Sequence, residues 1–232
     1  MERTNAYSLL DFLDNCPCNF FATATIQRYL DDNGFQELKQ SERWNLEKGG
    51  KYYVKKNDTA IFGFVIGETP LDQSGFNMIS AHSDSPCFRI KPNPEMLADG
   101  VLKLNTEVYG GPILYTWFDR PLSLAGRVIV RNPQNPARPI TKLIDFASPV
   151  LIIPHLAIHF NRNVNAGNPL SKQKDMLPIA AIVSDSMSKN NFLIDQIKER
   201  LEIADSKDIL DFDLMLYNCQ KSQLVGFNKE FI

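Results

Sequence analysis

The sequence predicts an α/β unit that is interrupted by a second, mostly β unit, and three observations carry this prediction. Helix and strand patterns alternate before residue 90. From Pro92 to Pro154 prolines recur and bracket short β-rich runs, which is typical of a separate β unit. A helical pattern then returns at 190–203, and a strand pattern follows at 211–217. We therefore expect an α/β unit at 1–91, a β-rich unit at 92–210 and a return to the first unit at 211–232.

Two helices are expected near the start of the chain. The apolar positions within residues 9–13 lie on one helical face, and Pro17 ends that pattern. The second helix is expected to begin at Asn19 as its N-cap and to stop before Gly34. These helices and a few strands give the first unit a thin core, so this unit begins in the sequence without being completed by it.

Strands are expected on both sides of the turn residues Asn57-Asp58, at 51–54 and at 60–66. Another strand is expected from Phe76 into His82. In the β-rich unit, a strand is expected from Gly126 to Val130.

The composition, with 44% hydrophobic and 22% charged residues among 232, is ordinary for a globular protein. A formal net charge of −2 gives no basic surface, so we expect no nucleic-acid partner. The apolar run 149–158 is too short to span a membrane, and Asp11 and Asp14 interrupt the first apolar stretch as no signal peptide would. The four cysteines lack the spacing of a zinc site and are expected to be reduced thiols. We expect a cytoplasmic protein with no membrane partner.

The most informative stretch is Ile-Ser-Ala-His-Ser-Asp-Ser-Pro-Cys at residues 79–87. His82 and Asp84 face the same side if the extended conformation persists to Pro86. Because a metal-binding imidazole needs a partner that orients it, His82 is a candidate ligand and Asp84 its orienting carboxylate. The pair is a weak signal by itself, since a histidine near a strand end is more often structural. One histidine also cannot hold a catalytic zinc, which takes three protein ligands.

The other two histidines, His155 and His159, are four residues apart. A helix would place them on one face, where they could chelate zinc. The glutamate of a His-Glu-x-x-His motif is absent, however, and Pro154 disfavours a regular helix. The alternative interpretation, which composition favours, is that both pack at a domain surface.

Several ordered motifs make the chain similar to one known family. Residues 81–92, Ala-His-Ser-Asp-Ser-Pro-Cys-Phe-Arg-Ile-Lys-Pro, resemble the metal-binding segment of the aspartyl aminopeptidase family. The similarity recurs upstream at Gly34-Phe35 and at 44–54, and downstream at 109–111, 117–128, 153–159 and 211–214. It therefore spans nearly the whole chain.

The resemblance implies a fold, an activity and an assembly. The fold would be the first part of a zinc-peptidase α/β domain, interrupted by a β-rich dimerisation domain. Family members bind two zinc ions, remove N-terminal aspartate or glutamate from peptides, and assemble as dodecamers. His82 falls on the family's first metal-ligand histidine, and Asp84 on the catalytic aspartate that orients that site. His159 falls on a histidine of the dimerisation domain that reaches the substrate site of a neighbouring subunit.

The resemblance also implies chemistry that this sequence only begins to supply. Two zinc ions would polarise the scissile carbonyl and lower the pKa of a bridging water, and a glutamate would accept its proton. In the family, that glutamate and four of the five metal ligands lie beyond the position of residue 232. We therefore expect this chain to be inactive by itself. The alternative hypothesis is a non-catalytic assembly module that retains the dimerisation domain.

Overall fold

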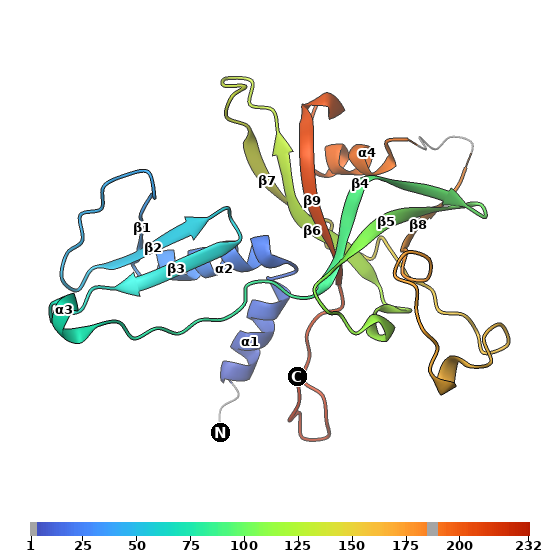
Figure 1. Ribbon diagram of the computed structural model, residues 1–232, viewed down its shortest axis with the longest axis horizontal. Helices are drawn as coiled ribbons and strands as arrows, with labels where there is room; N and C mark the ends of the chain where they lie inside the picture. Colours follow the sequence, from blue (N-terminus) through green and yellow to red (C-terminus); the bar gives the residue numbers. More distant parts are fainter. Residues whose placement is uncertain (1–3, 185–189) are drawn as a thin grey trace. The chain divides into compact units, whose positions relative to one another are not determined.

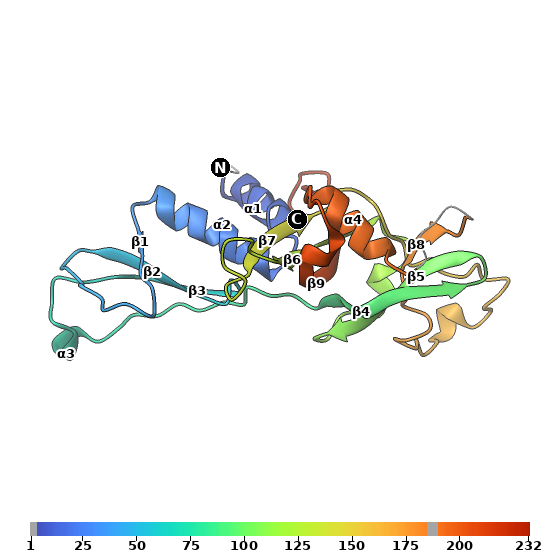
Figure 2. The ribbon, with the colours of Figure 1, turned by 90° about the horizontal axis from the view of Figure 1, so that it is seen from above.

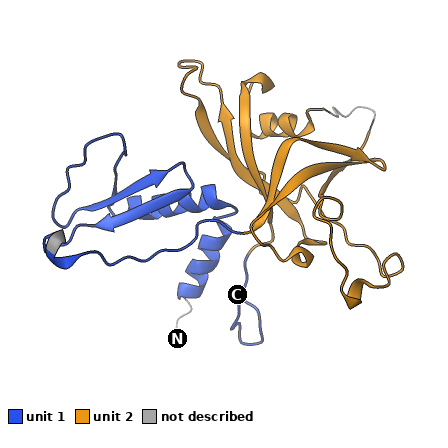
Figure 3. Cartoon of the chain, viewed as in Figure 1, with its two compact units in different colours: residues 1–85, 222–232 blue, residues 86–221 orange. Residues whose placement is uncertain are grey.

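The protein is described by a computed structural model that covers residues 4–184 and 190–232, and it divides into two compact units (Figure 3). The first unit comprises Met1–Ser85 and Ser222–Ile232, and the second comprises Pro86–Lys221. The sequence analysis divided the chain after residues 91 and 210, whereas the compact units divide it after Ser85 and after Lys221. The reason is that strands β4 (Cys87–Ala98) and β9 (Ile209–Asn218) belong to the sheet of the second unit.

The first unit combines helices with a small sheet of order β1-β2-β3 (Figures 1 and 2). The predicted helices are present, although Cys18 rather than Asn19 is the N-cap residue of the second. Strand β1 pairs parallel to β2, and β2 pairs antiparallel to β3. The elements are α1 (Thr4–Asp14), α2 (Asn19–Asp32), β1 (Gln36–Glu37), β2 (Lys51–Lys56), β3 (Ala60–Val65) and α3 (Leu71–Ser74).

Two local features fix β2 in the first unit. The β2–β3 hairpin turns through residues 57–59, where Asn57 and Asp58 have φ angles of 52° and 56° and the Thr59 N–H donates to the Lys56 carbonyl oxygen at 3.1 Å. Buried Tyr53 connects β2 to α2, because its hydroxyl donates to Asp31 Oδ1 at 2.8 Å and accepts from Gln27 Nε2 at 3.1 Å. Burial and the adjacent Asp31 carboxylate raise the pKa of Tyr53 to about 12, so the hydroxyl remains a proton donor at neutral pH.

The prediction of a strand from Phe76 into His82 is wrong. This segment has no regular secondary structure, and no strand within the described ranges pairs with it. Its apolar side chains lie in solvent, with exposed fractions of 70% for Phe76, 78% for Met78 and 102% for Ile79. A β-strand needs a neighbour to accept its backbone hydrogen bonds, and the sequence pattern does not say whether one is available.

The second unit is built on a six-stranded sheet of order β7-β6-β9-β4-β5-β8, in which all pairs are antiparallel (Figure 1). Pro92 and Pro94 lie in an irregular part of β4, where the register with β5 shifts between Ile90 and Glu95. The remaining elements are β5 (Val101–Tyr109), β6 (Leu122–Val130), β7 (Ile140–Asp145), β8 (Ile179–Ile182), α4 (Phe192–Arg200) and the 3-10 turns η1 (Leu114–Trp117), η2 (Val164–Ala166) and η3 (Ser206–Asp208).

Helix α4 closes the core of this unit. Leu193 and Ile197 are buried against sheet residues such as Phe88 and Leu214. The Glu95 carboxylate accepts from the backbone N–H of Leu193 at 3.0 Å, where the first turn of a helix has unpaired donors and a positive dipole end. Among the described residues, no helix has the length and apolar character needed to cross a bilayer.

The strand predicted at 211–217 exists as β9, but it does not return to the first unit. It runs between β6 and β4, paired with β6 from Leu122–Asn218 to Val130–Ile209. At Gly126 the two backbones approach so closely that a Cβ atom would lie 2.0 Å from the Asp213 carbonyl oxygen. Only glycine fits this position, because a contact under 3.0 Å with backbone forces the strands apart.

Gly126→Ala should therefore destabilise the chain by about 3 kcal/mol or more, as severe overpacking of a core strand does. Urea unfolding in a Trp44→Phe background measures this change, because the fluorescence then comes from Trp117 alone, which packs edge-on against Phe88. Gly111→Ala is the matched control, since no atom lies within 4 Å of its added Cβ. Equal stability of the two variants would show that the sheet opens at Gly126 without cost.

Candidate functional site

His82 and Asp84 lie in the first unit, on the irregular segment that follows α3. His82 Nδ1 is 3.0 Å from Asp84 Oδ1. When Nδ1 carries the proton it donates to the carboxylate, and Nε2 keeps its lone pair for a metal. Nε2 has no partner among the described residues, and the His82 side chain is 91% exposed. The pair thus has the geometry of an oriented but uncovered ligand.

Ser83, which the sequence analysis did not single out, holds this segment in place. Its Oγ donates to the carbonyl oxygen of Thr59 at 2.7 Å. Thr59 directly follows the Asn57-Asp58 turn, so the segment carrying the pair is anchored to the β2–β3 hairpin. The anchor replaces the strand that the sequence analysis invoked to align His82 with Asp84. Because Ser83 and Thr59 are 24 positions apart, no local sequence signal pointed to this anchor.

The described residues do not form a complete zinc site. Among the described residues, no group of three or more His, Cys, Asp or Glu side chains is arranged to hold a metal ion. Catalytic zinc takes three protein ligands, whereas His82 offers one nitrogen and Asp84 is occupied in orienting it. The residues present supply one zinc ligand, His82, and its orienting carboxylate, Asp84. No catalytic step through zinc is therefore assigned to them.

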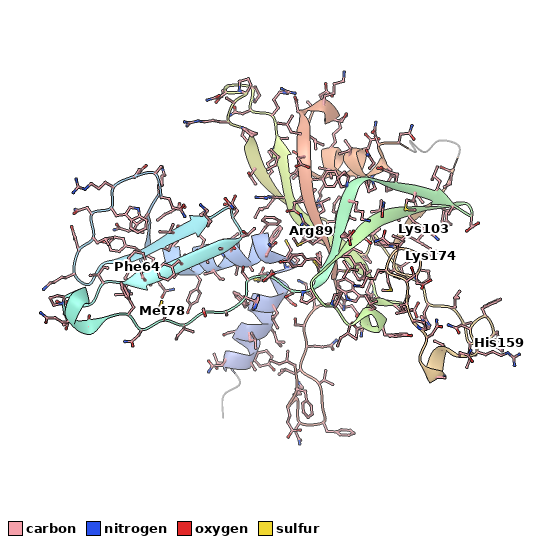
Figure 4. The ribbon with its side chains drawn as sticks, viewed as in Figure 1. Phe64, Met78, Arg89, Lys103, His159 and Lys174 are labelled. Atoms are coloured by element: carbon pink, nitrogen blue, oxygen red, sulfur yellow. The ribbon has the colours of Figure 1, made fainter. Side chains whose placement is uncertain are left out.

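His155 and His159 lie in the second unit, in a stretch without a helix, so the helical-chelate interpretation is wrong. His155 is half-buried: its backbone N–H donates to Asp119 Oδ1 at 3.0 Å, and its ring centroid is 4.5 Å from that of Phe118. His159 instead lies exposed in the turn at 158–160, out on a loop of this unit (Figure 4). The packing interpretation therefore suits His155 and leaves His159 free to meet a partner.

The loop around His159 is also apolar. Leu156, Ile158 and Phe160 have exposed fractions of 61%, 50% and 80%. Exposed apolar side chains that cluster on one loop are typical of an interaction surface.

The sequence has clear relatives. The model of the family described as Aminopeptidase I zinc metalloprotease (M18) matches residues 12–232. A probable M18 family aminopeptidase 2 of Clostridium novyi (strain NT) is 50% identical over 228 residues, which is 98% of this chain and 52% of the relative. The chain thus spans about half the length of the curated relatives that it matches.

Solved structures agree with this similarity. The structure of the Ape4 and Nbr1 complex contains a chain that is 31% identical, with a TM-score of 0.89 over 97% of this chain and 46% of that chain. The S. cerevisiae mApe1 dodecamer has a TM-score of 0.81 over 98% of this chain and 51% of that chain. At 22% identity, that second likeness shows the fold alone.

The chain purified by itself should bind zinc weakly and should not hydrolyse aspartyl or glutamyl anilides. One imidazole cannot replace a site that needs several deprotonated donors. Zinc content after dialysis and anilide assays measure both properties, with His155→Ala as the control for a histidine that only packs. Stoichiometric zinc, together with turnover that disappears in His82→Ala, would contradict this expectation.

Proposed function

The chain belongs to the M18 family of aminopeptidase I zinc metalloproteases and covers its N-terminal portion, and from this premise we propose that it supplies the first half of a metallo-aminopeptidase that removes N-terminal Asp or Glu from peptides. The observation that carries the proposal is the His82–Asp84 pair, at 3.0 Å and with Nε2 uncovered. In this role His82 contributes one imidazole ligand to zinc. Asp84 fixes its tautomer and ring orientation.

A second observation supports the need for further polypeptide. Strand β3 is an edge of the three-stranded sheet, and Phe62 on it is 56% exposed. Phe76, Met78 and Ile79 are exposed in the same unit. Exposed apolar side chains beside an open sheet edge are typical of a surface that another polypeptide covers. A polypeptide equivalent to the remaining half of the relatives would cover them and bring the missing ligands.

His159 is assigned a role across a subunit boundary. Its exposure, and the exposed apolar side chains of Leu156 and Phe160 beside it, suit a loop that contacts another copy of the chain. A histidine delivered in this way could hydrogen-bond the peptide substrate or the tetrahedral intermediate. We propose a homo-oligomer on this basis, a dodecamer like that of mApe1 from S. cerevisiae.

One observation favours a second candidate, a non-catalytic assembly module. The second unit has a continuous buried core and a six-stranded sheet of its own, whereas the described residues do not complete a metal site. In that case the chain would keep the interface loop around His159 and would have no need of His82. The two candidates differ in whether activity appears once the missing half is supplied.

Supplying that half should restore activity. Co-expression with the C-terminal half of the Clostridium novyi relative should give a zinc-loaded complex that cleaves aspartyl and glutamyl anilides faster than leucyl anilide. His82→Ala should abolish the activity, and Asp84→Asn should lower zinc affinity or rate about 10–100-fold. His155→Ala should leave the zinc content unchanged. An assembled complex that binds no zinc and has no activity would favour the assembly module, and faster cleavage of leucyl anilide would refute the acidic specificity.

His159→Ala in the same complex should lower the catalytic rate while zinc content and assembly stay unchanged. Mixing it with His82→Ala subunits should recover part of the activity, because some sites then combine an intact metal centre with an intact neighbouring histidine. Size-exclusion chromatography of differently tagged subunits checks that mixed oligomers form. If they form without recovery, His159 serves its own subunit or only packs.

A further inference from the structure

A cavity of about 260 Å³ is lined entirely by residues of the second unit, whereas His82 and Asp84 belong to the first. One side is strand β5, which contributes Lys103, and the other is formed by the loops before β8, which contribute Lys174. Both lysines line this one cavity, and Figure 4 labels them. The neighbours of Lys103 along the strand, Leu102 and Leu104, are buried in the core, so the alternation of a strand directs Lys103 to the opposite, cavity side.

The walls of this cavity are held by hydrogen bonds. Backbone bonds in both directions join Ile152 and Ile179, at 3.2 and 2.8 Å. The Tyr115 hydroxyl donates to the carbonyl oxygen of Asn168. His155 is fixed by Asp119 and by the ring of Phe118, which also lines the cavity. The cavity is therefore a formed feature of the fold, built from chain segments far apart in the sequence.

The side chains of the lining carry two positive charges, on Lys103 and Lys174, and one negative charge, on Asp175. Lys103 and Lys174 form no ion pair within residues 4–184 and 190–232. The single carboxylate of the lining, Asp175, already accepts from the backbone N–H of Ser171 through Oδ2 at 2.7 Å. By contrast, Lys91 on the adjacent strand is neutralised by Glu107 at 3.1 Å.

Lys103 is half-buried, and an ammonium group partly removed from water without an ion-pair partner costs free energy that an anion would offset. Asn161 and Asn168 are half-buried in the same lining, and their side-chain amides have no partner in the described parts of the chain. An amide can turn its N–H groups toward an acceptor, so both can donate to a bound oxygen. Phe118, Leu170 and Leu177 add apolar wall.

We infer that this cavity binds a small oxyanion, a carboxylate or a phosphate, through Lys103 and Lys174. Asn161 and Asn168 would donate to the remaining oxygen atoms, and Phe118 would contact an apolar body of the ligand. The apolar wall favours a small organic carboxylate over inorganic phosphate. This inference uses residues of the second unit alone and does not depend on the proposed peptidase function.

The test is a calorimetric titration of the 232-residue chain at constant ionic strength with benzoate, its neutral isostere benzamide, and inorganic phosphate. Benzoate should bind with a Kd of about 0.1–1 mM, as a ligand of this size can, and benzamide at least about 10-fold more weakly. If phosphate binds and benzoate does not, the cavity is still an oxyanion site, and its ligand is a phosphate rather than a carboxylate. Binding of neither anion, or equal binding of benzoate and benzamide, would overturn the inference.

Two lysine variants locate the site. Lys174→Met should weaken the binding of benzoate at least about 10-fold. Lys172 is an exposed lysine two positions away that does not line the cavity, so Lys172→Met should bind benzoate like the wild type. Because Lys174 is itself exposed, its replacement leaves the core intact, and circular dichroism verifies the fold. Lys103→Arg, which keeps the charge, should retain binding. Unchanged affinity in Lys174→Met would show that the anion binds elsewhere.

Discussion

The second unit depends on one constraint, that β9 must lie between β6 and β4. The carboxylate of Asp213 on β9 joins all three strands, because it pairs with Arg89 of β4 at 2.6 Å and lies 3.9 Å from Arg127 of β6. Gly126 permits the backbone approach that this arrangement requires. The core under α4 and the cavity beside β5 are both built on that sheet, so the pairing of β9 positions everything that this unit presents.

The elements were easier to predict than their partners. The strand predicted at 211–217 exists as β9, and the helical pattern at 190–203 corresponds to α4. Periodicity describes a strand's faces and not its neighbours, and β9 therefore joined a different sheet from the one expected. The same limit explains residues 76–82, where an apolar pattern exists but no described strand pairs with it. Burial in the structure depends on which neighbour is present.

The contact between His82 and Asp84 follows from sequence spacing, since residues two apart meet readily in an extended chain. The support for that contact could not be predicted, because Ser83 bonds a carbonyl of Thr59 that lies 24 positions away. The anion cavity was likewise not visible in the sequence. Lys103 and Lys174 carry no motif, and only the fold of the second unit brings them to one cavity.

The central place of β9 also bears on how the protein is made. The β4–β5 hairpin closes at Asp99-Gly100, and β6 pairs with β7, so both ribbons can form soon after they leave the ribosome. The strand that joins them is the last of this unit to be synthesised. Until then the nascent chain exposes an open edge on β4 and another on β6, each able to pair with other chains. The six-stranded sheet can therefore close only after β9 has been synthesised and has covered both open edges.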